Sequence, residues 1–402
     1  MTLEPPSPTT PRGRLIDGLA RAYPELAGDH ARMRVVRAPG RVNLIGEHTD
    51  YNDGLVLPAA VSLAIEIALI LTDDERVELT LASSGDRGTL DLRDLGPKRG
   101  TWLDYVAGTA WALQEAGVRT RGFRGILFST IPSGAGLSSS AAIELATAWA
   151  LAGGEAPALD PMTLARTAQR AENEYVGVMC GLMDQFAVTM GLAGMALHLD
   201  CRSLAWYPVP LPPEVELVVC HSGSPRRLEA SAYNARRREC ARAVATIAAR
   251  EPGVSSLRDV DRAMLERHRA SLDEVACARA LHVITENERV IEAEAALRSA
   301  DLDALGRLFA ASHASLRDRF EVSSDALDTL VEIAVGTPGV VAARLTGAGF
   351  GGCTINLVER GRAAALRAAV EREYGVRTGL TPRVFVVDAA DGAGFVPPTA
   401  ET

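Results

Sequence analysis

Lysine is almost absent from this chain: among its 402 residues, Lys98 is the only one. A Walker-type phosphate loop requires a lysine directly after its glycine-rich turn, so the sequence excludes that nucleotide-binding motif. The six cysteines include no Cys-x-x-Cys pair, and the N-terminal segment MTLEPPSPTTPRGR contains no apolar signal core. These absences predict reduced thiols and a cytoplasmic location.

Long apolar runs and an excess of positive charge are lacking as well. No apolar run reaches the roughly eighteen residues of a membrane span without a charge or a cluster of small and polar residues. The chain has 51 acidic and 42 basic residues, a net charge of −9, and its basic residues are scattered. We therefore expect no membrane, no nucleic acid and no obligate protein partner, because a small molecule fits this composition better.

The chain does contain enough apolar residues for a large core, with 47% hydrophobic and 23% charged residues. Because single cores stop growing near about 250–300 residues, we predict two domains with a ligand site in the cleft between them. A proline-rich connection at 207–216 places the boundary near residue 205. The predicted division is a tail over 1–13, a first domain over 14–205 and a second over 206–402, the last residues, 395–402, forming another tail.

Hydrophobic patterning predicts an α+β fold. In the first part we expect strands at 35–38, 55–71, 77–82 and 126–131, and a helix at 102–116. Helices should follow at 141–152 and 160–175, the second with Asp160 as its cap and Pro161 at its first position. In the second part we expect long helices at 230–250, 272–300, 301–317 and 362–375, and strands at 216–220, 354–358 and 381–389.

Chemistry-bearing side chains gather first in RAPGRVNLIGEHTDYNDG, residues 37–54. Arg41, Glu47, His48 and Asp50 lie within ten residues of one another, beside the apolar run of 55–71. Charged groups are rarely buried unless paired, so this density indicates a polar pocket at the edge of a core, suited to a polyhydroxylated molecule. The alternative is a solvated hairpin, because Asn-Asp-Gly at 52–54 is also good turn chemistry.

A second segment, PSGAGLSSSAA at 132–142, joins an expected strand to an expected helix. Bare backbone at Gly134 and Gly136 and the hydroxyls of Ser138, Ser139 and Ser140 suit a phosphate, whose charge the helix N-terminus attracts. The alternative is a helix cap with a flexible Gly-Ser loop. This strand-loop-helix context favours phosphate binding.

A third segment, GAGFGG at 347–352, formally matches the dinucleotide-binding fingerprint GxGxxG. That fingerprint must open a helix directly after a strand, whereas a strand follows the glycines here. We therefore predict a tight turn, in which the glycines let the second domain approach whatever lies over the loop at 132–142.

With these segments in hand, the chain resembles the galactokinase family of the GHMP kinase superfamily. The residues at 40–54 resemble the galactokinase signature, those at 132–142 the ATP motif of the superfamily, and those at 345–353 its third motif. Shorter matches lie at 180–186, 230–240, 282–290 and 315–323. Arg319 stands where the family usually has an acid and Leu345 where methionine is common. The family fold is two α+β domains with the active site in the cleft between them.

The resemblance implies roles for residues of the reaction centre. Asp184 would lie beside the attacking sugar hydroxyl as a base or as an orienting charge, with Arg41 between it and the transferred phosphoryl group. Magnesium would be held by Ser140 and Glu172. Glu174, two residues further, faces another side of a helix and is expected at the surface. Glu144 would complement the helix dipole without a catalytic role.

The resemblance also implies which residues bind the two substrates. Sugar contacts would come from Glu47, His48, Thr49, Asp50 and Tyr233, since carboxylates accept hydrogen bonds from neighbouring hydroxyls. ATP would be bound by Gly134, Ala135, Gly136, Leu137, Ser138, Ser139 and Ser140. Trp102 and Tyr105 resemble the aromatic residues beside adenine, although their helical spacing also fits plain packing. Cys180 and Cys353 flank motifs and are expected to be small buried hydrophobic residues.

The activity implied is ATP-dependent phosphorylation of the anomeric hydroxyl of α-D-galactose, giving galactose 1-phosphate and ADP, the first committed step of galactose catabolism. Two alternatives stay open at this point. One is a kinase for a related sugar, such as N-acetylgalactosamine or L-arabinose. The other is a non-catalytic sensor of galactose and ATP.

Overall fold

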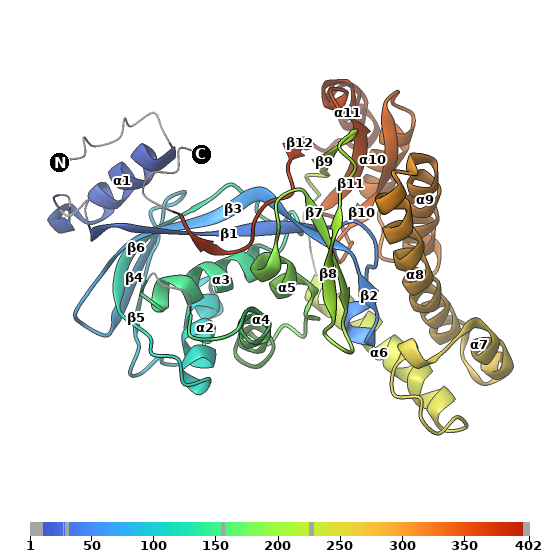
Figure 1. The fold of residues 1–402 in the computed structure, drawn as a ribbon, viewed down its shortest axis with the longest axis horizontal. Helices are drawn as coiled ribbons and strands as arrows, with labels where there is room; N and C mark the ends of the chain where they lie inside the picture. Colours follow the sequence, from blue (N-terminus) through green and yellow to red (C-terminus); the bar gives the residue numbers. More distant parts are fainter. Residues whose placement is uncertain (1–10, 27, 29–31, 154–156, 225–228, 397–402) are drawn as a thin grey trace.

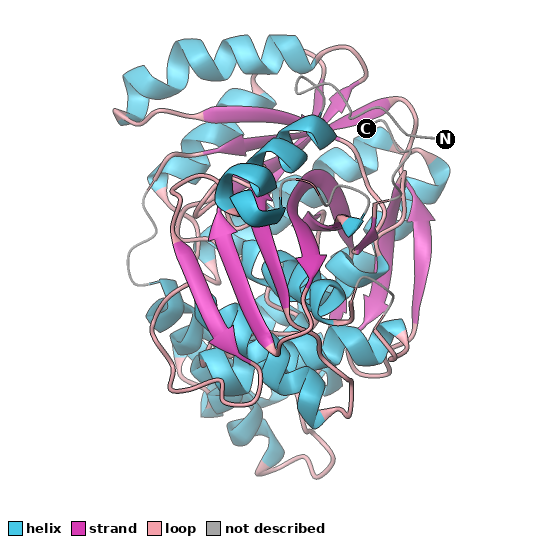
Figure 2. Ribbon diagram, turned by 90° about the vertical axis from the view of Figure 1, so that its left-hand side faces the viewer, coloured by secondary structure: helices cyan, strands magenta, loops and turns pink. Residues whose placement is uncertain are grey.

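Two lobes of mixed helix and sheet make up the computed structural model, which describes residues 11–26, 28, 32–153, 157–224 and 229–396 (Figure 1). The first lobe is built on a six-stranded sheet and the second on a four-stranded sheet, with a three-stranded sheet between them. Groups of helices flank the strands (Figure 2). The predicted α+β class is therefore confirmed.

The first lobe has the strand order β13-β1-β3-β6-β4-β5. Neighbouring strands are antiparallel, except that β4 and β6 are parallel. The strands are β1 (Arg34–Asn43), β3 (Pro58–Leu71), β4 (Arg76–Leu81), β5 (Arg87–Asp91), β6 (Phe123–Ser129) and β13 (Gly394–Phe395). The helices are α1 (Pro11–Ala22), α2 (Leu103–Glu115), α3 (Ser139–Leu151), α4 (Pro161–Arg170) and α5 (Met183–Met190).

Strand β3 explains the long apolar run of the sequence. Ala68 and Ile70 pack in a core with α1, whereas Ile67 and Leu69 pack in the main core with α2 and α3. Successive side chains of a strand point to opposite faces, so a strand covered on both faces needs apolar residues at nearly every position.

The second lobe has the strand order β10-β11-β9-β12. Its strands are β9 (Val215–His221), β10 (Val340–Thr346), β11 (Cys353–Glu359) and β12 (Arg383–Val387). Its helices are α6 (Glu229–Ala248), α7 (Arg262–His268), α8 (Glu274–Ser299), α9 (Leu302–Asp318), α10 (Asp325–Val335) and α11 (Ala363–Thr378). The small sheet is formed by β2 (Leu55–Val56), β7 (Met195–Asp200) and β8 (Trp206–Pro210).

Several local expectations need correction. Helix α1 begins at Pro11, so residues 11–13 are helical and not part of a tail, while residues 1–10 lie outside the described residues. The proline-rich connection contains β8, which is tolerated because β8 is an edge strand of its sheet. Phe395, assigned to a tail, pairs with Val36 in the first lobe.

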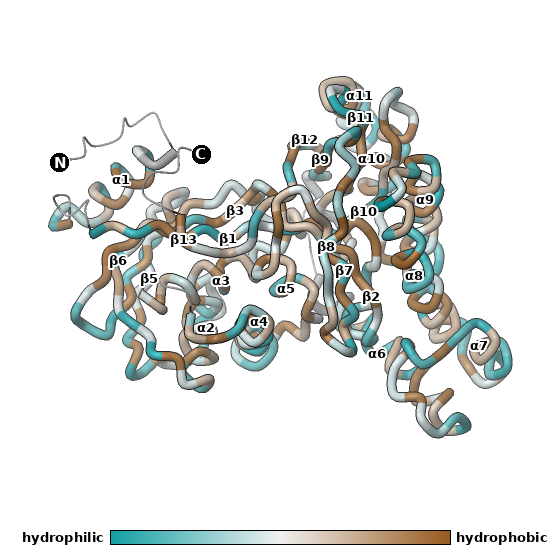
Figure 3. The backbone as a smooth tube through the Cα atoms, in the orientation of Figure 1, coloured by the Kyte–Doolittle hydropathy of each residue, from teal (hydrophilic) through white to brown (hydrophobic). Residues whose placement is uncertain are grey.

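The chain crosses between the lobes more than once. After β12 it returns to the first lobe, where the N–H of Ala390 donates to the carbonyl of Ala60 and that of Ala393 to the carbonyl of Val188. Strand β13 then lies beside β1 (Figure 3). The second half of the chain therefore supplies a strand to the sheet of the first lobe. The division of the chain into two domains at a boundary near residue 205 stays a prediction.

Within the part of the chain that the structure describes, no helix is both long and apolar enough to cross a membrane.

Candidate active site

A cavity of about 370 Å³ opens between the lobes and contains most of the predicted site. The predicted residues that line it are Arg41, Glu47, His48, Asp50, Tyr105, Gly134, Gly136, Ser138, Ser139, Ser140, Glu172, Asp184 and Tyr233. Residues that we did not predict also line it, namely Val178, Cys180, Gly181, Met183, Asn234, Gly347 and Ala348. Segments up to 300 residues apart in the sequence thus meet at one place.

Asp184 and Arg41 form a two-point ion pair at the centre of this cavity. Arg41 is on β1, and its Nε and Nη2 donate to the two carboxylate oxygens of Asp184, each at 2.8 Å. Asp184 is in the first turn of α5, a helix that we did not predict. The side chain of Arg41 is only 5% exposed and that of Asp184 is 24% exposed. A fork-to-fork pair of this kind fixes both groups in direction as well as in charge.

The phosphate loop is fastened to this pair. The Nη1 of Arg41 donates to the carbonyl of Gly136 at 2.6 Å, and its backbone N–H donates to the carbonyl of Leu137 at 3.1 Å. Ser138 precedes α3 in a left-handed conformation, and its hydroxyl donates to Asp184 at 2.5 Å. The loop is therefore not a simple serine-capped helix start, because the side chain of Ser138 points at Asp184 and caps no backbone group.

Carboxylates and an amide surround the position predicted for a metal. Gln185 donates to Glu172 at 2.7 Å and to Glu144 at 3.0 Å, and the nearby hydroxyl of Ser140 favours the charged form of Glu172 and so lowers its pKa. Burial raises the pKa of Glu172 to about 7, and the charge of Asp184 adds to this shift. Glu144 is completely buried, and burial and the charge of Glu172 raise its pKa well above its usual value.

This donor set fits magnesium. The described residues contain no cluster of three or more His, Cys, Asp or Glu side chains arranged as a metal cage. Magnesium needs no such cage, since it binds one or two protein oxygens and completes its shell with phosphate and water. One carboxylate oxygen of Glu144 and the amide oxygen of Gln185 are buried without a hydrogen-bond partner, so unused oxygen ligands lie close to Ser140 and Glu172.

The loop that carries Glu47, His48 and Asp50 is held by helix α8 of the second lobe. His282 contacts the carbonyl of Glu47 through Nε2 at 3.1 Å, and Glu286 accepts the N–H of Gly46 at 3.0 Å. Asn287 accepts the N–H of Leu55 at 2.8 Å. The spacing of four residues places His282 and Glu286 on one face of α8. Polar groups of the loop backbone are thus paired although the loop is buried.

His48 is held as a neutral ring. Its Nε2 lies 3.2 Å from the carbonyl of Ala348, so this nitrogen carries the proton, and Nδ1 can accept from the hydroxyl of Tyr51 at 3.0 Å. Burial lowers its pKa to about 3, with a further contribution from His282. Its ring also packs on Phe320, with the centroids 4.6 Å apart.

Asp50 and Tyr233 present polar groups to the cavity from opposite lobes. A methyl group on Gly181 would lie 1.8 Å from a carboxylate oxygen of Asp50, so the side chain of Asp50 occupies space that only glycine leaves free. Burial raises the pKa of Asp50 to about 6, and the nearby charge of Asp184 raises it further.

Four predicted contact residues do not line the cavity. The hydroxyl of Thr49 donates to the carbonyls of Gly46 and Leu55, so it stabilises the conformation of the loop. Trp102 donates through its indole N–H to Asp86 at 2.8 Å. Ala135 and Leu137 are buried in the core behind the loop. Sequence patterns cannot separate these residues from the ones that face the cavity, because Thr49, Ala135 and Leu137 lie within the same motifs as those residues and Trp102 lies on the same expected helix as Tyr105.

Cys180 also differs from our expectation. It lines the cavity and is partly exposed, with its sulfur 3.4 Å from a carboxylate oxygen of Glu172. Cys353 is buried in β11, as expected for a small hydrophobic residue.

The glycine turn at 347–352 is a tight connection between β10 and β11 and does not open a helix. Gly347 has a φ of +81°, and a Cβ added to it would lie 3.0 Å from the carbonyl of Gly136. Its N–H donates to Glu47 at 3.0 Å. The predicted tight turn is confirmed, and the approach of these glycines to a ligand over the phosphate loop stays a prediction.

Comparison with known proteins agrees with this geometry. Three family models match the chain: the galactokinase galactose-binding signature at residues 21–69, the GHMP kinases N terminal domain at 104–192 and the GHMP kinases C terminal domain at 293–376. The chain is 44% identical to a galactokinase of Roseiflexus sp. (strain RS-1), over 90% of this chain and 93% of that protein. It is 41% identical to a galactokinase of Chloroflexus aurantiacus, over 91% and 94%.

Solved structures give the same result. The galactokinase of Lactococcus lactis complexed with galactose has a TM-score of 0.88 and 34% identity, covering 95% of this chain and 98% of that one. The mevalonate kinase of Methanococcus jannaschii shares the fold, with a TM-score of 0.64, 19% identity, and coverage of 90% and 100%.

Proposed function

The chain belongs to the galactokinase family of the GHMP kinases and phosphorylates galactose with ATP, and we propose how its own residues carry out that reaction. The acceptor is the anomeric hydroxyl of α-D-galactose, and the products are galactose 1-phosphate and ADP. This is the first committed step of galactose catabolism. The observation that carries the proposal is the ion pair of Arg41 and Asp184 beside the phosphate loop.

Asp184 orients the attacking hydroxyl and receives its proton as the oxygen bonds to the γ-phosphorus and ADP leaves. Arg41, held between Asp184 and Gly136, stabilises the negative charge that spreads over the phosphoryl oxygens. Phosphoryl transfer depends chiefly on positioning and on charge stabilisation, which a rigid guanidinium bonded to three acceptor oxygens supplies.

ATP lies with its phosphates over Gly134, Gly136 and Ser138–Ser140, where the N-terminus of α3 favours negative charge. Tyr105 is the aromatic residue of the nucleotide side, supported by its place in the cavity wall. Ser140 and Glu172 would hold the magnesium ion that we propose as cofactor, which would supply neutralisation of the charge on the phosphates.

Galactose is bound by Glu47, His48, Asp50 and Tyr233. Their placement in the lining of the same cavity and the polar character of each group support this assignment. Asp50 is the residue that we propose to distinguish galactose from glucose, because a buried acceptor left unpaired penalises an epimer strongly. A cytoplasmic location and the lack of an obligate protein partner remain predictions from the sequence.

The test is ADP release measured with galactose, glucose, N-acetylgalactosamine and L-arabinose as acceptors. We expect kcat/KM for galactose to exceed that for each of the other sugars by at least about tenfold, and phosphate to appear on the anomeric oxygen by NMR. A higher kcat/KM for one of the other sugars would move the assignment to that sugar. Binding of galactose and ATP without any ADP release would identify a sensor.

A further inference from the structure

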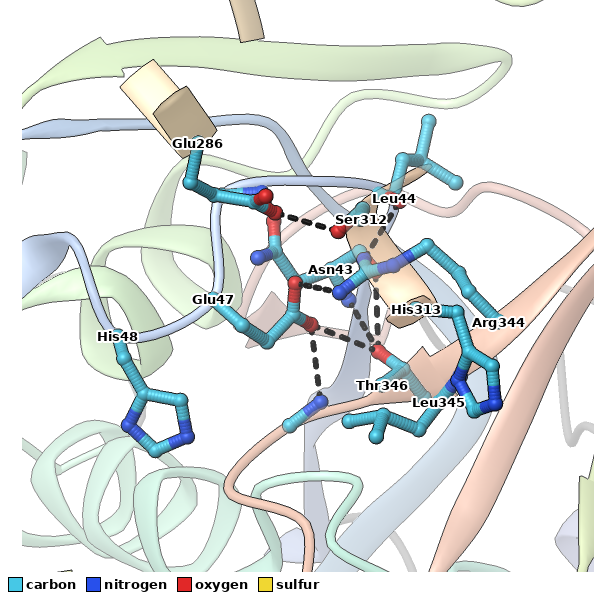
Figure 4. Close-up of polar contacts among 12 residues, drawn as sticks. Asn43, Leu44, Glu47, His48, Glu286, Ser312, His313, Arg344, Leu345 and Thr346 are labelled. Atoms are coloured by element: carbon cyan, nitrogen blue, oxygen red, sulfur yellow. Dashed lines mark hydrogen bonds and ion pairs between the residues drawn. The ribbon is translucent and has the colours of Figure 1, made fainter. Parts of the chain in front are cut away.

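Arg344 lies outside the cavity but is connected to it. It is on β10 of the second lobe and is completely buried. Its guanidinium reaches the first lobe, where Nη1 donates to the carbonyl of Leu44 at 2.7 Å and to that of Asn43 at 3.3 Å (Figure 4). Its Nη2 forms an ion pair with the carboxylate of Glu47.

Glu47 connects Arg344 to a residue that lines the cavity. One of its oxygens is paired with Arg344, and the other accepts the N–H of Gly347 at 3.0 Å (Figure 4). Gly347 lies so near the carbonyl of Gly136 that a Cβ added to Gly347 would come within 3.0 Å of it, and Arg41 binds that same carbonyl at 2.6 Å. Hydrogen bonds therefore join Arg344 to Gly347 through Glu47, and Gly347 packs closely over the carbonyl that holds the Arg41–Asp184 pair.

We propose that Arg344 is a positioning residue for phosphoryl transfer: through Glu47 it sets the distance between the sugar-binding loop and the glycine turn that rests on the phosphate loop. This inference rests on the function proposed above and adds a residue that neither substrate contacts. The carboxylate of Glu47 holds the N–H of Gly347. The guanidinium of Arg344 in turn holds that carboxylate in place.

The shape of arginine is what this role requires. A planar guanidinium can hold two backbone carbonyls and a carboxylate in fixed directions at once, whereas the ammonium of lysine is a point charge on a flexible stem. Both residues would neutralise Glu47. Arg344→Lys therefore keeps the charge and removes the directed contacts, which separates positioning from neutralisation.

The experiment compares wild type with Arg344→Lys in the ADP-release assay, after thermal unfolding has established the folded fraction. Because a displacement of about 1 Å can cost about a hundredfold in rate, we expect kcat per folded enzyme to fall by about tenfold or more. The dissociation constants of galactose and of a non-hydrolysable ATP analogue, measured by calorimetry, should stay within about threefold of wild type, since lysine keeps a positive charge beside Glu47 and the other residues that bind the substrates are unchanged. A kcat within about twofold of wild type, or a loss matched by weaker binding of either substrate, would overturn the proposal.

Arg279→Lys is the matched control. Arg279 is 3% exposed and pairs with Glu239 and with the carbonyl of Arg319, away from the cavity lining. Its substitution should lower the unfolding temperature and leave kcat within about twofold. An equal loss of kcat in this control would mean that buried arginines act only through general stability, and the proposal would be wrong.

A second variant keeps the test decisive if Arg344→Lys does not fold. The hydroxyl of Thr346 accepts the N–H of Asn43 at 2.9 Å and also contacts Glu47. Thr346→Val removes this hydroxyl from the same set of contacts at nearly constant shape, so it should lower kcat by about threefold or more with unchanged binding, and unchanged kcat would reject the proposal. Absence of galactose-dependent ADP release from wild type would instead reject the proposed function itself.

Discussion

Asp184 is the residue that connects Arg41 and the phosphate loop, and we propose that it also receives the proton of the sugar hydroxyl. Its two oxygens accept three hydrogen bonds, two from Arg41 and one from Ser138. An asparagine has the same shape but only one oxygen, so it can neither keep this arrangement nor receive a proton. Asp184→Asn should therefore lose about a hundredfold or more in kcat and still bind galactose, as turnover assays and calorimetry can measure.

Asp104→Asn provides the control for Asp184→Asn. Asp104 is buried and, like Asp184, accepts several hydrogen bonds, here from the backbone N–H groups of Arg99 and Gly100, but it lies outside the cavity lining. Its replacement should lower stability without lowering kcat per folded enzyme. Turnover in Asp184→Asn that matches this control would remove Asp184 from the mechanism.

The carboxyl group of Asp50 should lower the free energy of unfolding as the pH rises, whereas an ion-paired carboxylate raises it. Its pKa is raised from 3.8 to about 6 in the folded protein by burial and by Asp184, so the folded state binds more protons between these values. The stability that the neutral form contributes is present at low pH and is lost as the pH rises through about 6. Asp50→Asn should not lose this stability, because asparagine does not ionise.

The difference in unfolding free energy between Asp50→Asn and wild type should therefore grow in favour of the variant from about pH 4 to about pH 7, by up to about 3 kcal/mol. Urea unfolding of both proteins across this range measures the difference, in which the contributions of all shared groups cancel. A difference that does not change with pH would show that Asp50 is ionised without cost. Activity on galactose should be severely reduced in the same variant.

The sequence predicted which residues belong to the site better than it predicted which way their side chains point. Arg41, Glu47, His48 and Asp50 could be predicted because charged residues so close together beside an apolar run are unusual. Arg344 was missed, although an arginine between the apolar residues of VVAARLTG carries the same signal. Its partner lies 297 residues away, and no local pattern contains that information.

Helix α4 ends in a structure that decides which of two nearby glutamates faces the cavity. Residues Ala171–Val176 form one wider π-helical turn after α4. Glu172 is 5% exposed and lines the cavity, whereas Glu174 points outward and pairs with Arg170 at 3.0 Å. Rare π-helical turns of this kind occur often at functional sites.

A magnesium titration tests this assignment. Ser140→Ala and Glu172→Ala should raise the magnesium concentration for half-maximal rate, and Glu174→Ala should not, because an exposed pair of this kind contributes little. Affinity for an ATP analogue, measured with and without magnesium, gives a second readout. A larger effect of Glu174→Ala than of Glu172→Ala would reverse the choice of ligand.

The elements with strong local signals were predicted best. Asp160 caps α4 and Pro161 occupies its first position, as expected. Helix α5 was missed because its eight residues give too short an apolar pattern, although it carries Asp184. Strand β8 was read as a connection because proline is rare inside sheets, and only its edge position permits it.

At the scale of the whole molecule, the site exists only where the lobes meet. The first lobe contributes Arg41, Asp184 and the phosphate loop, and the second contributes Tyr233, Gly347 and the supports on α8. The motifs were visible in the sequence, but the contacts between them depend on long-range packing, so their assembly could not be derived from any one segment.

The return of the chain from β12 to β13 has a consequence for how the protein is made. Residues 388–396 are synthesised after both lobes, yet 388–390 pair with residues 60–62 of β3, and 394–396 pair with residues 35–37 on the side of β1 that β3 leaves open. Until then part of β1 is an unpaired edge, which in a nascent chain is a site for pairing with other strands. The first sheet is therefore completed only after the second lobe has been synthesised, and the edge of β1 at residues 35–37 stays open until then.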